Sequence, residues 1–221
     1  MKVSRVFIIN WLLVIGMFGL SIWAWLQLPS DAQIATRFDF DGLPTAYMSK
    51  MWGLLLSPLI ALAFVVAHPI LPKIEPNKQN LNRSQKAYDI FSIAFLVFFS
   101  IVHSAIVFSA LGQAIDVPTI VIVALGGFLI VFGNYFSKIR RNYSFGVRTP
   151  WTLSSNLAWH KTHRLAGWLT VIHGVGLIIT ALRSHTILPV IVLISFVVTD
   201  IVVLPVYSYL LWRSDSNRST E

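Results

Sequence analysis

Apolar and polar stretches alternate along this chain with a spacing that predicts its architecture. Six predominantly apolar segments are each close to the roughly 20 residues that a helix needs to cross the hydrocarbon of a bilayer. They cover residues 6–28, 51–71, 87–111, 118–136, 165–182 and 187–212. The pattern therefore predicts an all-α integral membrane protein with six transmembrane helices.

The composition agrees with this class. Only 12% of the 221 residues are charged and 56% are hydrophobic, whereas soluble domains carry about 25% charged residues. The absence of cysteine excludes disulfides, thiol nucleophiles and cysteine-ligated metals. The net charge of +8 does not by itself indicate nucleic acid, because basic residues accumulate in the cytoplasmic loops of membrane proteins. We expect membrane lipids around the chain and no direct contact with nucleic acid.

The distribution of basic residues predicts the orientation. Arg37, Lys50 and Arg183 are the only ones in the loops after the first, third and fifth spans. The remainder of the 17 Lys and Arg residues lie at the two ends of the chain or in the loops after the second and fourth spans. By the positive-inside bias, both termini are predicted to be cytoplasmic.

The loop at residues 29–50 is the one sizeable segment on the external side. Alternating and aromatic residues over 34–40 predict a short extended piece, and Asp41-Gly42 is a strong turn signal. Asp31, Asp39 and Asp41 could form an acidic patch, which allows two interpretations. The favoured one is ordinary turn chemistry, in which short acidic side chains bond to the nearby backbone. The other is a docking surface for an external cationic or amphipathic partner.

The loop at residues 137–164 is dense in cations and turn-forming residues between two nearly charge-free spans. Ser154 or Ser155 can cap a new helix that runs through Trp159 into the fifth span. Lys161 and Arg164 then lie near the start of a helix, where the macrodipole disfavours cations, and a lipid phosphate, an acidic protein surface or a small phosphorylated ligand would relieve this. The alternative is an ordinary positive-inside loop with snorkelling arginines. The candidate ligand- or partner-binding residues here and just before the loop are Asn134, Arg140, Asn142, Gly146, Arg148, Thr149, Pro150, Trp159, His163 and Arg164.

Ionisable residues within the spans form a second candidate group. Asp200 is the one acidic residue deep in a span. Ionisable residues there cost free energy and are usually paired. A rise of 1.5 Å per residue allows either His173 or His103 to reach it, and His173 on the adjacent span is preferred. Two roles remain open: a structural contact, which we favour, and proton coupling. His160 and His163 share a helix face but lack a third ligand nearby, so we expect a partly solvated pair and no metal.

No phosphate-binding loop, serine elbow or zinc motif occurs in the sequence. No nucleophile and base pair is visible either, so we expect a protein that is not an enzyme and holds no cofactor. Gly126-Gly127 and Gly174-x-Gly176 are interpreted as points of close helix packing.

Two motifs together resemble the SdpI family of bacterial membrane proteins. One motif is similar to the core signature of that family. It comprises Gly133-Asn134 through Asn142, Gly146–Leu153, Trp159 and His163–Gly167. The other motif resembles the DUF1648 domain, which is often found before the SdpI core in the chain. It comprises Leu28-Pro29, Ile34, Phe38, Gly42, Pro44 and Ser49-Lys50. The resemblance implies a DUF1648-like membrane segment at 1–86 with the external loop 29–50, and an SdpI-like core at 87–221 with the cytoplasmic loop 137–164.

The resemblance also implies a function. The namesake of the family is an immunity protein that protects a cell from a secreted antimicrobial peptide. It also signals, by recruiting a cytoplasmic repressor to the membrane. We therefore expect a multi-pass immunity protein of the bacterial cytoplasmic (inner) membrane, whose partners are a secreted peptide toxin and a cytoplasmic repressor protein. External residues Asp39, Asp41, Gly42 and Lys50 would face the peptide. The alternative is a proton-coupled transporter or lipid-handling protein that uses Asp200, His173 and His103.

Overall fold

The computed structural model describes residues 5–39, 42–183 and 187–216. The described residues contain six helical segments long and apolar enough to cross a membrane, as the hydropathy predicts. They are formed by α1 (Arg5–Gln27), α2 (Lys50–Ala67) with α3 (Leu71–Ile74), α5 (Gln85–Ala110), α6 (Val117–Phe136), α8 (Asn156–Leu182), and α9 (Leu188–Val198) with α10 (Leu204–Ser214). The protein is therefore a multi-pass, all-α membrane protein.

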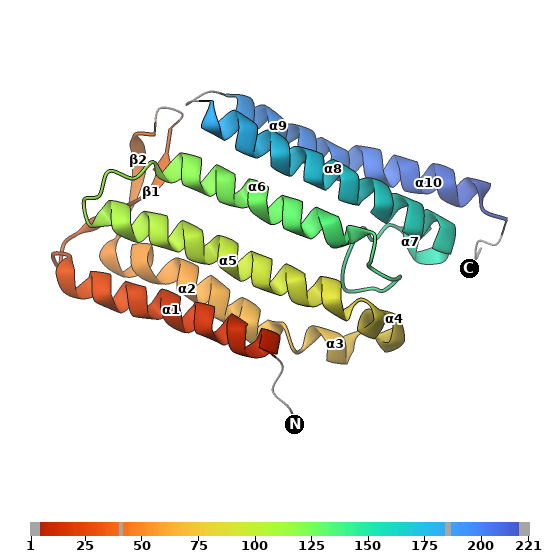
Figure 1. Cartoon of the computed structure of the whole chain (residues 1–221), viewed down its shortest axis with the longest axis horizontal. Coiled ribbons are helices and arrows are strands. Elements are labelled where there is room, and N and C mark those ends of the chain that lie inside the picture. Colours follow the sequence, from red (N-terminus) through yellow and green to blue (C-terminus); the bar gives the residue numbers. More distant parts are fainter. Residues whose placement is uncertain (1–4, 40–41, 184–186, 217–221) are drawn as a thin grey trace.

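The spans run antiparallel, so their connections gather at two ends of the bundle (Figure 1). One end, here called the hairpin end, carries the strands β1 (Gln33–Phe38) and β2 (Pro44–Ser49). The other, here called the loop end, carries α3, α4 (Lys78–Arg83), α7 (Pro150–Ser154) and the start of α1 and end of α10 (Figure 1). The beginning of α1 and the end of α10 therefore lie on one side of the bundle, as an even number of crossings requires. Which side is cytoplasmic stays a prediction.

The helices form two groups that meet where α5 packs on α6 (Figure 1). α1, α2 and α5 make the first group, and α6, α8, α9 and α10 make the second. Within the second, α6 and α8 touch through two glycine pairs. A Cβ on Gly126 would lie 2.6 Å from the Gly174 carbonyl oxygen, and a Cβ on Gly133 would lie 2.9 Å from that of Gly167. Only glycine permits so close an approach.

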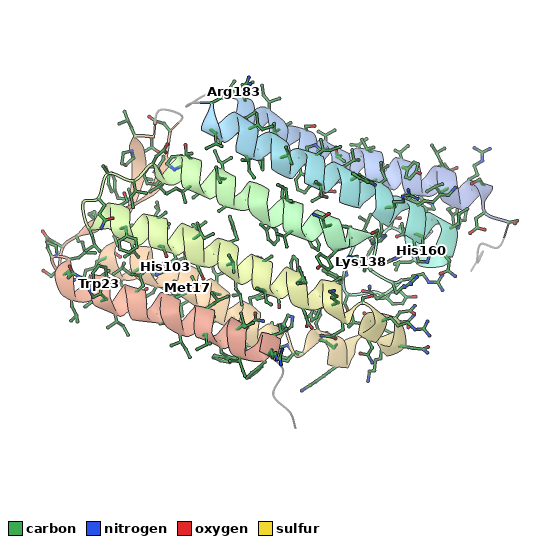
Figure 2. The ribbon with its side chains drawn as sticks, in the orientation of Figure 1. Met17, Trp23, His103, Lys138, His160 and Arg183 are labelled. Atoms are coloured by element: carbon green, nitrogen blue, oxygen red, sulfur yellow. The ribbon has the colours of Figure 1, made fainter. Side chains whose placement is uncertain are left out.

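These contacts confirm the expected packing role of Gly126 and Gly174. The same expectation was wrong for Gly127, because a Cβ there would meet nothing within 4 Å. Gly176 makes only ordinary contact with Val192. In the first group, apolar clusters are joined by a buried polar contact between α1 and α5: the His103 Nε2 lies 3.0 Å from Ser21 Oγ and 3.2 Å from the Met17 carbonyl oxygen (Figure 2).

At the hairpin end, β1 and β2 pair antiparallel, with Ile34 opposite Met48. The extended segment predicted from the alternation at 34–40 is thus confirmed over the described part. Ile34 is 1% exposed and packs onto α2 at Gly53, where an added Cβ would lie 2.6 Å from the Ile34 side chain. One buried isoleucine therefore fixes the hairpin to the bundle.

The sixth span is not a uniform α-helix. A π-helical turn, Thr199–Val203, joins α9 to α10 and contains Asp200. Pro205 lies two residues after the turn and has no backbone N–H to donate, which disfavours a regular α-helical hydrogen bond at this point. The turn places the Asp200 side chain on an exposed surface of the bundle, although an acid at this depth is usually enclosed.

Candidate functional site

The motif loop, residues 137–149, is held in shape by Asn142, which is completely buried. Its Nδ2 donates to the carbonyl oxygens of Arg140 (2.8 Å) and Phe145 (3.1 Å). Its Oδ1 accepts from the backbone N–H groups of Ser144 (2.9 Å) and Phe145 (2.7 Å). Both donors and both lone pairs of the amide are thereby used. The predicted compact turn exists, and Asn142 builds it from within.

Gly146 and His163 form the next contact of the motif. Gly146 has φ +110°, and a Cβ on it would lie 2.4 Å from the His163 Nε2. His163 Nδ1 lies 2.9 Å from the Trp159 carbonyl oxygen, which can only accept, so Nδ1 carries the proton. The bare Nε2 accepts from the N–H of Val147 at 3.1 Å. His163 is fully buried, so the expected solvated His160–His163 pair was wrong, because the loop encloses the second ring.

Trp159 extends this buried unit. Its indole N–H donates to the Ile139 carbonyl oxygen at 2.8 Å, and its ring stacks on His163 with centroids 4.0 Å apart. Phe145 joins the same apolar cluster, in which it meets Tyr88 edge to face. The motif residues Asn142, Gly146, Trp159 and His163 therefore form one packed core at the loop end.

Two helix N-caps lie between the motif loop and α8. Thr149 caps α7, and its Oγ1 accepts from the N–H of Thr152 at 3.1 Å, with Pro150 in the first turn. Thr149 Oγ1 also lies 2.9 Å from Ser208 Oγ of α10. Ser155 caps α8 by accepting from the N–H of Ala158 at 3.0 Å, which confirms one of the two serines proposed for this role.

A second set of contacts comes from the connection between α2 and α5, which sequence reasoning missed. The Ser84 Oγ accepts from the N–H of Arg140 at 2.8 Å. The Asn80 Nδ2 donates to the Arg141 carbonyl oxygen at 2.9 Å. Glu75, only 1% exposed, accepts from the N–H of Tyr143 at 3.1 Å and from the Ser144 hydroxyl. Glu75, Asn80 and Ser84 together hold the motif loop from outside.

The charge of Glu75 is stabilised where it lies. Burial alone would raise the pKa of this carboxyl. Hydrogen bonds from the Ser144 hydroxyl and from the N–H groups of Tyr143, Asn77 and Ser144 outweigh that effect and lower the pKa below its ordinary value. Glu75 is therefore an ionised acceptor inside the loop end. Its position on a polar connection, separated from the loop by two spans, gave no sequence signal for this pairing.

The cations of the motif point outward from this core. Arg140, Arg148 and Arg164 are exposed. Arg148 Nη1 donates to the Tyr143 carbonyl oxygen at 2.6 Å, which holds its side chain against the loop. Arg140 lies close enough to His160 for their charges to interact. A rigid loop thus displays guanidinium groups at one end of the bundle, an arrangement suited to anionic surfaces.

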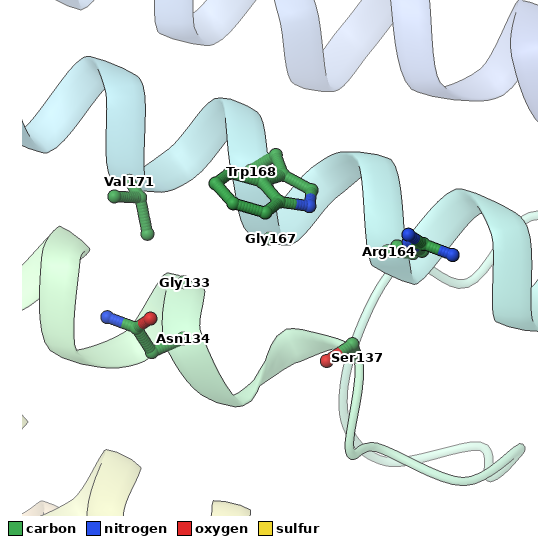
Figure 3. Close-up of a pocket in the computed structure, with 7 residues that line it drawn as sticks. All are labelled: Gly133, Asn134, Ser137, Arg164, Gly167, Trp168 and Val171. Atoms are coloured by element: carbon green, nitrogen blue, oxygen red, sulfur yellow. The ribbon is translucent and has the colours of Figure 1, made fainter.

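Between α6 and α8 lies a cavity of about 290 Å³ beside the motif loop. It is lined by Gly133, Asn134, Ser137, Arg164, Gly167, Trp168 and Val171 (Figure 3). The Asn134 Nδ2 donates to the Ile130 carbonyl oxygen of its own helix at 2.8 Å. It therefore does not hold the following loop, a role that Asn142 takes instead. Asn134 and Arg164 are the two candidate binding residues from the sequence that line this cavity.

The intramembrane candidates lie apart from the motif. His173 Nδ1 is 2.6 Å from the Leu169 carbonyl oxygen and its Nε2 is 3.2 Å from Ser195 Oγ. Asp200 interacts electrostatically with His173, the partner preferred from the sequence. His103 belongs to the other helix group and contacts α1. In the described part of the chain no three His, Asp or Glu side chains come together as a metal site would require.

The candidates of the loop 29–50 have contacts or backbone conformations that support the local fold where they are described. Asp39 Oδ1 accepts from the N–H of Leu43 at 2.8 Å, and Gly42 has φ +80°, so both serve the turn. Asp41 lies outside the described residues. Lys50 is 7% exposed, donates to the Leu28 carbonyl oxygen at 2.7 Å and lies over the Trp25 ring. Its ammonium group thus braces the start of α2.

The fold and this site define a class: a six-span α-helical membrane protein with a rigid, cation-bearing loop at one end. Comparison with known proteins shows which families the chain is similar to. Residues 138–208 match the SdpI/YfhL protein family, and residues 12–62 match the domain of unknown function DUF1648. The chain is 26% identical over 203 residues to Immunity protein SdpI of Bacillus subtilis (strain 168), covering 88% of this chain and 92% of that protein. The resemblance to the SdpI family predicted from the motifs is thereby confirmed. No solved structure gives a significant match.

Proposed function

We propose that this chain is a membrane immunity protein, located in the bacterial cytoplasmic membrane, that protects against a secreted antimicrobial peptide. The observation that carries the proposal is the alignment with Immunity protein SdpI over nearly the full length of both chains. A match that included only the spans could reflect shared apolar composition. This one includes the polar motif loop, which falls almost entirely within the family match.

The proposal divides the work between the two ends. The hairpin end would meet the peptide, and the loop end would face a cytoplasmic repressor. Arg140 and Arg148 support the second assignment, because they are exposed on a loop whose backbone is fixed by Asn142 and Glu75. A fixed cationic surface loses little conformational entropy when an acidic partner binds. Neither role requires a catalytic group.

Expression in a sensitive host tests the immunity function. Cells that carry the chain should survive higher doses of at least one member of a panel of membrane-active antimicrobial peptides. Arg148→Ala should lower this protection, or the transcriptional response, while the amount of membrane-inserted protein stays the same. Arg83→Ala is the matched control, since it removes an exposed cation of α4 at the same end. Unchanged protection and response in Arg148→Ala, Asn142→Ala and Gly146→Leu alike would exclude the motif loop as the working site.

The orientation is tested separately. A reporter fused after Glu221 should be cytoplasmic, and one inserted near Asp41 should be external. An external carboxyl terminus would exchange the proposed faces of the hairpin end and the loop end.

A second function, proton-coupled transport, is favoured by one observation. Asp200 lies in a π-helical turn within a span and interacts with His173 on the neighbouring helix. Such turns are frequent at functional sites. Replacement of Asp200, described below, separates this alternative from immunity.

A further inference from the structure

The cavity between α6 and α8 is built by close helix packing. A Cβ on Gly167 would lie 2.7 Å from the Gly133 carbonyl oxygen, so neither helix tolerates a larger residue at this contact. The two glycines form the base of the cavity, and larger side chains on either side of them form its walls. Asn134 and Ser137 come from the α6 wall, and Arg164 and Trp168 come from the α8 wall (Figure 3).

The one charged side chain in the lining of this cavity is the cation Arg164. The Arg164 guanidinium makes no hydrogen bond or ion pair within the described residues. Lys138, Arg140 and Lys161 are nearby in sequence and also exposed. No acidic residue occurs between Asp116 and Asp200. α6, the motif loop and α8 therefore supply no carboxylate of their own to neutralise Arg164, and an anion from outside would complement it.

The position of the cavity restricts which anion fits. Ser137 ends α6 at the loop end, and Arg164 lies in the third turn of α8, so both are near the polar edge of the span. Trp168, 65% exposed, follows one turn deeper toward the middle of the bundle. A cation at the edge with an indole beneath it matches a phospholipid, whose phosphate lies in the interface and whose acyl chain begins below.

We propose that this cavity binds the phosphate group of an anionic phospholipid. Arg164 pairs with the phosphate, the Ser137 hydroxyl and the Asn134 amide offer further hydrogen bonds, and Trp168 contacts the glycerol and upper acyl chain. The excess of cations around the cavity favours a lipid with net negative charge over a zwitterionic one. This site does not depend on the immunity function, because it requires neither a peptide toxin nor a repressor.

Native mass spectrometry of the full chain, released from phosphatidylcholine vesicles with or without phosphatidylglycerol, tests the proposal. Phosphatidylglycerol should be retained about tenfold more strongly than phosphatidylcholine, which corresponds to about 1.4 kcal/mol. Arg164→Gln should abolish most of this preference. Lys161→Gln is the matched control, since it removes the same charge from the same helix outside the cavity lining. Arg164→Lys should give an intermediate result, because lysine cannot bind phosphate in bidentate fashion.

The outcomes separate the sources of the anion. Equal loss of preference in Arg164→Gln and Lys161→Gln would show only general surface charge and overturn the site. Binding of inorganic phosphate through Arg164 without any phosphatidylglycerol preference would also overturn it in favour of a soluble phosphorylated ligand. Trp168→Leu should weaken the retention of phosphatidylglycerol. It should not change how readily inorganic phosphate displaces the lipid from the cavity. A folded Arg164→Gln protein with full preference would contradict the proposal directly.

Discussion

The polar connections between spans are ordered in different ways at the two ends of the bundle. At the hairpin end, a polar connection between spans is ordered by backbone pairing of β1 with β2 and anchored by the buried Ile34. At the loop end, the motif loop has no such ladder among the described residues and is ordered by side chains that bond to its backbone. Asn142 does so from within the loop, and Glu75 does so from another connection.

The difference teaches how to interpret polar motif residues. In the hairpin, side chains can change if pairing and one apolar anchor persist. In the motif loop, the polar side chains themselves replace secondary structure, because buried backbone groups need partners. A dense polar signature can therefore report a folding requirement, whereas the side chains of Arg140 and Arg148 lie exposed outside the buried part of the loop.

The largest effect is expected for Gly146→Ala. A side chain at φ +110° is strained by about 1–3 kcal/mol. Its Cβ would lie 2.4 Å from the His163 Nε2, which adds about 1–3 kcal/mol of overpacking. The resistance of the purified protein to thermal unfolding should fall by the sum. Gly127→Ala, where a Cβ meets nothing within 4 Å, should be close to neutral. Similar stability of the two variants would refute the described loop geometry.

Ile34→Ala should cost about 2–4 kcal/mol, because it leaves a cavity where the hairpin meets Gly53. Hydrogen exchange should accelerate in β1 and β2 and remain slow in the motif loop. Leu43→Ala, at a position 62% exposed, is the control and should change neither region. Faster exchange at both ends in Ile34→Ala would show that the two ends are not independent.

Glu75→Gln should cost about 1–3 kcal/mol, because charge-assisted hydrogen bonds to Tyr143 and Ser144 are weakened. The pKa of Glu75 is lower in the folded protein than its ordinary value of 4.5. Its stabilising contribution is therefore complete above that ordinary value and is lost as the pH falls through the folded pKa. Unfolding at stepwise lower pH should show this loss in the natural chain and less of it in Glu75→Gln. Asp31→Asn, exposed at the hairpin end, should preserve the acid response.

The smallest effect is expected for Asp200→Asn. The side chain is exposed and its contact with His173 is electrostatic, so an amide should change stability by less than about 0.5 kcal/mol. Cells that carry Asp200→Asn should retain their tolerance to the peptide, and cells that carry His173→Gln should retain it too. A folded Asp200→Asn protein without activity would instead place proton coupling above immunity.

Hydropathy alone predicted the six spans, since about 20 apolar residues are required in each. Local chemistry predicted the Ser155 cap and the extended segment containing Ile34. Sequence reasoning did not predict the burial of Lys50 or the contact of Glu75 with Ser144, residues that lie 69 positions apart. Such contacts depend on which helices become neighbours, and a periodic pattern within one segment carries no information about that.

The contacts of Glu75, Asn80 and Ser84 also bear on modularity. All three lie before residue 87, where the SdpI-like core was predicted to begin, yet they bond to the motif loop of that core. A fragment starting at residue 87 would lose these partners and leave backbone groups of Arg140, Arg141 and Tyr143 without them. The predicted boundary at residue 87 therefore separates the motif loop from three side chains that hold it. A chimera that takes its first two spans from a relative should order its loop only if the connection after the second span is transplanted with the core.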